Sequence, residues 1–295
     1  MNRKYAKIAL MLFACIMLVS CGKNGETEIS ESVKKGGIEH TSKYRLEESE
    51  TQNTVEFNDS GIRVLFTKLI YDDGVTRLAY SAQNSNDYPV TIVSDNISFN
   101  GMVCSDSLNI KLLKDGKQLG TFDVGNDWFS KMGIEKITDV EFTVTAFDEN
   151  GSEITRSDLL SIKTDALGEY KQAYETHGTE LFSGKNIKIL SREIRKSDHS
   201  NDAELVLYVE NNSKKTVTVV TSDVSVNDKE INATYISTLS PGKKSVDTLL
   251  LSENALKENE ISEIKKVCAN FKAYNDDFEI VFETGILNIP LEMPE

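Results

Sequence analysis

The chain has 295 residues, 39% of them hydrophobic and 27% charged, which gives room for two ordinary domains and is typical of a folded protein. Its 47 Asp and Glu outnumber its 33 Lys and Arg, and a net charge of −14 at pH 7 argues against a nucleic-acid partner. The mean hydropathy of −0.33 restricts any membrane element to a short part of the chain.

The first residues have the pattern of a secretory signal peptide. Arg3, Lys4 and Lys7 precede an apolar run over residues 8–18. At about 1.5 Å rise per residue, this run is too short to cross a hydrocarbon core of roughly 30 Å. We therefore expect a secretory h-region and not a membrane-spanning helix.

The tetrapeptide Leu18-Val19-Ser20-Cys21 follows the apolar run directly. It resembles the lipobox of bacterial lipoproteins, in which the cysteine thiol receives a diacylglycerol thioether and a peptidase then cleaves before that cysteine. The resemblance implies cleavage between Ser20 and Cys21 and anchoring of Cys21 on the extracytoplasmic face of the cell membrane. Two acyl chains anchor a protein stably in a bilayer, whereas a single chain gives only marginal membrane binding. The alternative is an ordinary secreted protein in which Cys21 is incidental.

Cleavage would change both the charge and the cysteine content. Removing residues 1–20 takes away three positive charges and no negative ones, so the net charge falls from −14 to −17. Cys15 leaves with the signal peptide and Cys21 is lipidated, which leaves Cys104 and Cys268. Export permits a disulfide between these two, but with one cysteine in each half of the chain we expect free thiols.

Residues 22–52 are rich in Gly, Glu, Ser, Thr, Lys and Asn and hold no helical or alternating period. We predict that this segment is a disordered spacer behind the lipidated Cys21. A flexible coil of this length spans roughly 30 Å root mean square. That distance lifts a folded body clear of the lipid surface.

The rest of the chain contains an internal duplication. Residues 84–100 match residues 211–227 at an offset of 127, from an Asn-rich turn through a Val/Ile-rich strand to a closing asparagine. Upstream of this run the offset is 125, and the two-residue difference falls in a loop, where insertions are tolerated. We predict two repeats, residues 53–164 and 177–295, joined by a linker over residues 165–176.

Within each repeat the apolar residues alternate with polar ones. The runs Ile62-Val64-Phe66 and Val140-Phe142-Val144 have the period of two that half-buried strands show. Short strands in about 110 residues predict two tandem immunoglobulin-like β-sandwiches, and a barrel is the alternative. The runs are separated by turn dipeptides: Asp73-Gly74, Asp115-Gly116, Asn150-Gly151 and Pro241-Gly242.

One short helix is expected in each repeat before its late strands. Asn126 and Ser252 are the predicted N-caps, and Gly133 is the predicted end of the first helix. The paired pattern of turn, strand and Ser-Phe-Asn or Ser-Val-Asn resembles tandem immunoglobulin-like lipoproteins of Gram-positive bacteria, a group without an assigned function. That resemblance implies a fold and a location and carries over no functional residues.

No catalytic, metal or cofactor motif is found in the sequence. His40, His177 and His199 are scattered, whereas a zinc site needs about three or four ligands at short, paired spacing. A nucleophile elbow and a phosphate-binding loop are also missing. We expect no enzyme activity, no cofactor and no metal.

Two acidic patterns suggest cation binding only weakly. Residues 148–153 place oxygen donors around a glycine but lack the terminal bidentate glutamate of a calcium loop, so we expect a solvated hairpin turn. The loops at residues 72–73 and 198–202 occupy equivalent positions in the two repeats. Weak cation binding there is an alternative to simple exposure.

Three further features have a packing and a functional interpretation. Trp128 matches Ala255 in the second repeat, so we expect it to pack on the sandwich edge and not to anchor a ligand. Tyr170 and Tyr174 in the linker are expected to pack between the domains. Cys268 lies between apolar neighbours in a strand, and strand parity predicts that it faces outward as an unreactive thiol.

The leading hypothesis is a non-enzymatic binding or scaffold module at the cell envelope, held to the lipid bilayer by its N-terminal diacylglycerol. Its partner would be an envelope protein or polymer, contacted through loops or sheet edges. The alternative is a small-molecule or cation-binding accessory lipoprotein of a transporter. A hydrolase would require a cleft lined with carboxylates.

Overall fold

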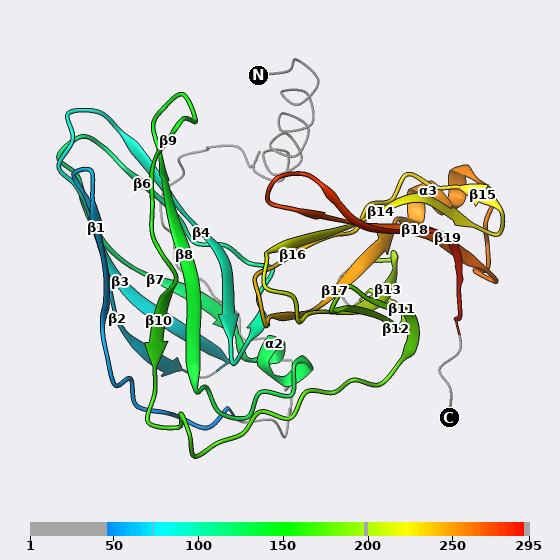
Figure 1. Cartoon of the computed structure of the whole chain (residues 1–295), viewed down its shortest axis with the longest axis horizontal. Coiled ribbons are helices and arrows are strands. Elements are labelled where there is room, and N and C mark those ends of the chain that lie inside the picture. The colour runs from blue at the N-terminus through cyan, green and yellow to red at the C-terminus, as the bar shows by residue number, and fades with distance from the viewer. Residues whose placement is uncertain (1–45, 73, 198–199, 292–295) are drawn as a thin grey trace, which may run out of the picture. The chain divides into compact units, whose positions relative to one another are not determined.

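The computed structural model describes residues 46–72, 74–197 and 200–291 (Figure 1). All of them belong to one compact unit, Lys43–Glu295. This part of the chain is mostly strand, paired antiparallel almost throughout, and its two helices have six residues each, which confirms the predicted all-β class. No helix within these ranges is long and apolar enough to span a membrane.

The elements of the first repeat run from residue 55 to residue 163. They are β1 (Val55–Asp59), β2 (Ile62–Asp72), β3 (Val75–Asn84), β4 (Val90–Phe99), β5 (Met102–Val103), β6 (Asn109–Leu112), β7 (Lys117–Gly125), α2 (Asn126–Lys131), β8 (Asp139–Phe147), β9 (Glu153–Arg156) and β10 (Leu160–Lys163).

The elements of the second repeat follow in the same order. They are β11 (Thr179–Gly184), β12 (Ile187–Lys196), β13 (Ala203–Asn211), β14 (Val217–Val226), β15 (Lys229–Glu230), β16 (Ile236–Leu239), β17 (Lys244–Leu251), α3 (Glu253–Glu258), β18 (Val267–Asn275) and β19 (Ile280–Ile289).

The bounds of these elements recur at the spacing of the sequence duplication. The pairs β4 and β14, β5 and β15, β6 and β16, and α2 and α3 each begin and end 127 residues apart, and β2 and β12 begin 125 apart. The last strand differs, because β9 and β10 of the first repeat correspond to the single long β19 of the second.

The strands form three hydrogen-bonded sheets. The first has the order β1-β2-β3-β7, and a five-stranded sheet of the second repeat has the order β15-β14-β18-β19 with β16 beside β14. The ten-stranded sheet has the order β10-β8-β4-β5-β17-β13-β12-β11, with β6 beside β4 and β9 beside β8. Within it, β5 and β17 pair in parallel at Met102 and Lys244.

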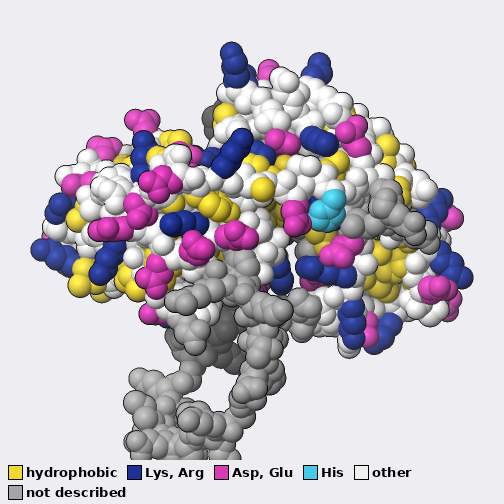
Figure 2. Space-filling view, turned by 90° about the horizontal axis from the view of Figure 1, so that it is seen from below, with side chains coloured by type: hydrophobic (Ala, Val, Ile, Leu, Met, Phe, Trp, Pro, Cys, Tyr) yellow, Lys and Arg dark blue, Asp and Glu magenta, His cyan; other side chains and the backbone are white. Residues whose placement is uncertain are grey.

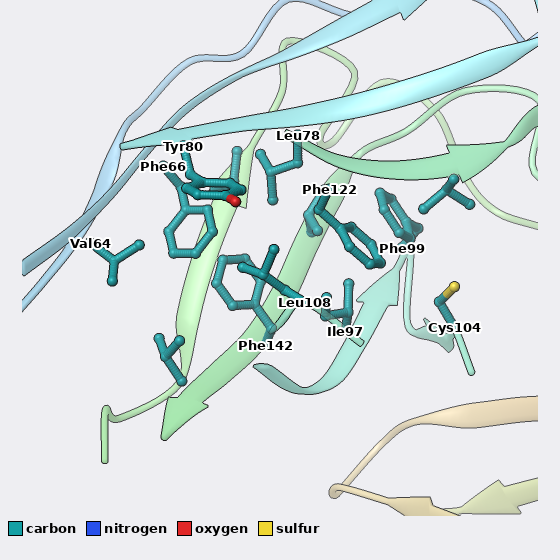
Figure 3. Packing of buried hydrophobic residues seen from close by; sticks show 14 of the residues in the cluster. Val64, Phe66, Leu78, Tyr80, Ile97, Phe99, Cys104, Leu108, Phe122 and Phe142 are labelled. Carbon is teal, nitrogen blue, oxygen red and sulfur yellow. The ribbon is translucent and has the colours of Figure 1, made fainter. Parts of the chain in front are cut away.

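The core of the first repeat is rich in aromatic rings (Figure 3). Phe66 of β2 and Phe142 of β8 are each about 1% exposed, and their rings meet edge to face with centroids 4.6 Å apart. Trp128 and Phe129 of α2 form a second group with Phe99, at centroid distances of 5.0–5.7 Å. Edge-to-face pairs of this kind add to the free energy gained by burying the rings.

The core of the second repeat is mostly aliphatic. Val219, Val226, Leu207 and Leu249 are fully buried there, and Phe271 is a buried ring among them. The buried residues of β14 alternate with less buried ones as the period of two predicts, whereas the central part of β13 and the start of β18 are buried without alternation. The same pleated surface is therefore packed with branched side chains in place of rings.

The N-caps of the two helices differ. Ser252 caps α3 as predicted, and its Oγ accepts a hydrogen bond from Ala255 N at 3.2 Å. The prediction of Asn126 as N-cap is wrong by one residue, because Gly125 is the N-cap and makes no side-chain cap bond. Asn126 Oδ1 instead accepts a hydrogen bond from the Thr76 hydroxyl at 2.9 Å.

The predicted disordered spacer is too long at its C-terminal end. Leu46 and Ser49 are buried at 4% and 6% exposure, and Ser49 Oγ donates to Ile137 O at 2.8 Å. Gln52 N donates to Lys163 O, which places this stretch beside β10. Residues 46–52 therefore belong to the packed body, because isolated Leu46 fills a space in the core; residues 22–45 lie outside the described part of the chain.

Candidate functional site

Several of the predicted site residues lie outside the described part of the chain. These are the cleavage pair Ser20 and Cys21, and also His40 and His199. The lipid anchor therefore stays a prediction. His177 is described, and its Nδ1 lies 3.6 Å from a Glu175 carboxylate oxygen at an exposed position.

The two described cysteines are free and buried. Burial raises the pKa of the Cys104 thiol to about 12, so it stays protonated at neutral pH. The prediction that Cys268 faces outward is wrong, because Val267–Phe271 are buried without alternation and Cys268 is 8% exposed. Strand parity separates two faces only where one of them is open, and β18 is covered on both at this end.

The described aspartates of the acidic loops have partners within the protein. Asp72 forms an ion pair with Arg77, and Asp202 Oδ1 accepts from Glu253 N, the first residue of α3, at 2.7 Å. That backbone N–H and a hydroxyl keep the pKa of Asp202 below its ordinary value. Asp148 Oδ1 accepts from two backbone N–H groups of the hairpin that follows it. Among the described residues, no group of three or more His, Cys, Asp and Glu is placed to hold a metal ion.

The aromatic side chains singled out in the sequence pack against the first repeat. Trp128 is partly buried and its ring meets Phe99 edge to face at 5.7 Å. Tyr174 is also partly buried against this core, and Lys244 Nζ lies 4.3 Å from the centroid of its ring. Both side chains therefore have partners within the protein.

At one end of each repeat, a single asparagine forms most of the side-chain hydrogen bonds between a turn and a loop. Asn100 follows β4 and adopts a left-handed conformation with φ of 50°. Its Nδ2 donates to Lys136 O at 2.8 Å, and its Oδ1 accepts from Thr138 N at 2.7 Å. One side chain thus ties the turn after β4 to the loop before β8, and we call residues 100–102 with 133–138 the first corner.

The second repeat builds the same arrangement around Asn227, whose φ is 51°. Its Nδ2 donates to Glu263 O at 2.7 Å, and its Oδ1 accepts from Lys265 N at 2.9 Å. Every one of these positions lies 127 residues after its counterpart in the first corner. We call residues 227–229 with 260–266 the second corner.

The first corner is occupied by the linker. Gln172 Nε2 donates to Gly133 O at 2.9 Å, and its Oε1 accepts from Asn100 Nδ2 at 3.2 Å. The Tyr174 hydroxyl donates to Asn100 O at 2.7 Å. The linker is thereby held to the end of the repeat from which it emerges.

The second corner is open and forms a hollow of about 360 Å³. Figure 1 shows β15 and α3 close together, and Lys229 Nζ donates to Asn259 O between them. The walls of the hollow carry both charge signs and consist of Asn227, Asp228, Lys229, Glu260, Ile261, Ser262, Glu263, Lys265 and Lys266.

Two smaller hollows lie on the first repeat. One of about 300 Å³ is bordered by Arg63 and by the exposed start of β7, where Leu119 is 83% exposed. The other, of about 230 Å³, lies beside Pro89 and Leu112. Acidic and basic side chains are interspersed on the face shown in Figure 2.

The sequence holds a partial signal for the two corners in the last residue of its duplicated run. The duplicated run ends on Asn100 and Asn227, each followed by a residue of a two-residue turn. An asparagine matched at the end of a strand favours a left-handed turn. Its partners, however, lie about 36–38 residues further along the chain, and the sequence does not show that pairing.

No protein-family model and no curated protein matches the chain. Among solved structures, red sea bream transglutaminase is similar at 6% identity and a TM-score of 0.22, over 78% of this chain and 31% of that one. The exo-chitosanase CsxA of Amycolatopsis orientalis is similar at 12% identity and a TM-score of 0.22, over 72% of this chain and 25% of that one. This chain thus spans about a third or less of the chains it matches.

Proposed function

We propose that this protein is a lipid-anchored, extracytoplasmic binding or scaffold module at the cell envelope, built from two immunoglobulin-like sandwiches and without enzyme activity. The lipobox-like Leu18-Val19-Ser20-Cys21, behind a basic and then an apolar segment, supports the anchor. The duplicated order of short antiparallel strands supports the pair of sandwiches.

One observation above all supports the binding role. The second corner is an open, polar hollow of about 360 Å³, whereas the equivalent corner of the first repeat is filled by a segment of the chain. A recess of this kind, lined by backbone carbonyls and by charges of both signs, suits a polypeptide better than a single ion. The partner is therefore proposed to be another protein of the envelope.

The anchor is tested by replacing Cys21 with alanine in the full chain. Wild type grown with radiolabelled fatty acid should carry the label and sediment with membranes, because two acyl chains hold it there. The Cys21→Ala chain should carry no label and appear in the soluble fraction. Cys104→Ala is the matched control, since it removes a buried thiol and leaves the lipobox unchanged. A labelled, membrane-bound Cys21→Ala chain contradicts the anchor.

The binding role is tested by cross-linking in intact cells. A photoreactive side chain at Ser262, in the second corner, should trap a defined protein partner after illumination. The same side chain at Glu135, the equivalent position of the occupied first corner, is the control and should give only background. If neither Ser262 nor probes at Leu119 and Leu113, two exposed side chains of the first repeat, trap any envelope protein, the binding function is wrong.

A further inference from the structure

We infer that the second corner docks a segment of another polypeptide that carries a glutamine or asparagine followed, two positions later, by a tyrosine. This inference rests on the proposed binding function and narrows it to one site and one partner chemistry. It is carried by the first corner, where the chain itself supplies Gln172 and Tyr174 to the same framework.

The contacts in the first corner use groups that any sequence would provide, together with one asparagine. Gln172 bonds Gly133 O and Asn100 Nδ2, and Tyr174 bonds Asn100 O. Two of the three corner atoms are therefore backbone carbonyls. Both carbonyls belong to residues with a left-handed backbone, Asn100 and Gly133, whose φ values are 50° and 65°.

The second corner presents the same three atoms. Asn227 and Glu260 take the places of Asn100 and Gly133 and have φ of 51° and 54°, so the backbone is left-handed at the same two positions in both corners. Within the described residues, no group donates a hydrogen bond to Asn227 O or Glu260 O. The Asn227 amide has two hydrogens and gives one to Glu263 O, which leaves the other for an acceptor from the docked segment.

The substitutions between the two corners leave room for the same ligand groups. A Cβ added to Gly101 would lie 3.4 Å from the Tyr174 hydroxyl, an ordinary contact, so the first side-chain atom of Asp228, which replaces this glycine, fits beside a phenol there. The Asp228 carboxylate is held by Lys266 Nζ at 2.6 Å. A Cβ added to Gly133 would meet nothing within 4 Å, so the first side-chain atom of Glu260, which replaces this glycine, adds no clash.

The hydrogen-bonding groups of the corner favour an amide over a charged side chain at the glutamine position of the docked segment. The position of Gln172 must donate to one carbonyl and accept from an amide at the same time. A carboxylate only accepts and an ammonium only donates, so neither satisfies both partners. A peptide with glutamate or lysine there should therefore bind more weakly than one with glutamine.

The test uses the detergent-solubilised full chain and a fluorescein-labelled peptide, LGEYKQAYETH, that copies residues 167–177. Fluorescence anisotropy should show saturable, weak binding in the submillimolar to millimolar range. In the peptide, replacing the glutamine by glutamate or the second tyrosine by phenylalanine should each weaken binding severalfold, and both changes together at least tenfold. Replacing the first tyrosine, which matches Tyr170, should have little effect.

Protein variants locate the binding site. Ser262→Trp fills the second corner and should weaken binding at least tenfold, whereas Glu135→Trp at the equivalent position of the first corner should leave it unchanged. The melting temperature of each variant shows that it is folded. The inference is overturned if wild type does not bind the peptide, if Ser262→Trp binds as wild type does, or if Glu135→Trp abolishes binding. In any of these cases a partner trapped in cells would still support the proposed function.

Discussion

The two repeats reach the same strand order with different side chains in their cores. Phe99, Trp128, Phe129 and Phe142 of the first repeat correspond to Val226, Ala255, Leu256 and Ala269 of the second. Yet β4 and β14, and also α2 and α3, keep identical lengths. The frame therefore depends on the pattern of buried positions more than on the identity of the residues that fill them.

The buried polar groups behave in the opposite way. Asn84 and Asn211 are both fully buried at equivalent positions, and each Nδ2 donates to one backbone carbonyl of the following turn and to a second one 28 or 29 residues further along the chain. Asn100 and Asn227 likewise keep their partners. A buried amide must find specific partners, whereas a methyl group only needs space, so the asparagines are less replaceable than the rings.

The largest expected difference between the repeats lies beside their helices. Phe129→Ala should cost about 3–5 kcal/mol, since Phe129 is fully buried and contacts two other rings. Leu256→Ala, at the equivalent position of α3, should cost less, about 1–2 kcal/mol, because Leu256 is only partly buried. Urea unfolding of the full chain measures both, and Lys257→Ala, an exposed site on α3, is the control. Equal losses would show that the aromatic core adds nothing to the first repeat.

The corners should show the next largest difference. Asn100→Ala should cost about 2–3 kcal/mol, because Asn100 is 3% exposed and its loss leaves Thr138 N and Lys136 O without their partner. Asn227→Ala should cost about 1–2 kcal/mol, because Asn227 lies in an open corner where water replaces the lost bonds. Unfolding in urea compares the two. A larger loss for Asn227 would contradict the view that only the first corner is filled.

How far the sequence predicts this structure depends on the range of the interactions. The alternation of apolar and polar residues predicts the strands, and the internal duplication predicts that the same strands recur in the second repeat. Both patterns can be read directly from the residues. The sequence also indicated Ser252 as a cap, since a cap bonds a neighbour three residues away. It failed at Cys268, whose exposure depends on what covers β18, and at Leu46, whose contacts lie far along the chain. The hydrogen bonds of the two corners could not be predicted for the same reason, because they join residues far apart in the chain.

A smaller effect is expected where the linker meets the first corner. Tyr174→Phe removes the hydrogen bond from the hydroxyl to Asn100 O and keeps the ring, so it should cost about 1 kcal/mol. Tyr170→Phe is the matched control in the same linker and should have little effect on the free energy of unfolding. Thermal unfolding distinguishes them. If both changes are neutral, the linker is not held at the corner by this bond.

The smallest effect concerns Asp247, a half-buried carboxyl at a position where the first repeat has Gly120. Asp247 pairs with Leu207 across β17 and β13, where the first repeat has Gly120 beside Tyr80. A Cβ on Gly120 would lie 2.5 Å from the Tyr80 hydroxyl oxygen, so the larger ring excludes a side chain there, and the smaller leucine admits one.

Burial raises the pKa of the Asp247 carboxyl, against a hydrogen bond from Thr248 N that lowers it. A carboxyl whose pKa is higher in the folded than in the unfolded protein stabilises the fold most when it is protonated. That stability is fully present below the unfolded pKa of about 3.9 and is lost as the pH rises through the folded pKa.

Asp247→Asn keeps an acceptor for Thr248 N without the charge, so it should be about 0.5 kcal/mol more stable than wild type at pH 7. The advantage should vanish below about pH 4. Urea unfolding at pH 3.5, 5 and 7 measures this difference, with the exposed Asp276→Asn as control, and a variant less stable than wild type at pH 7 would show that the Asp247 charge is favourably placed.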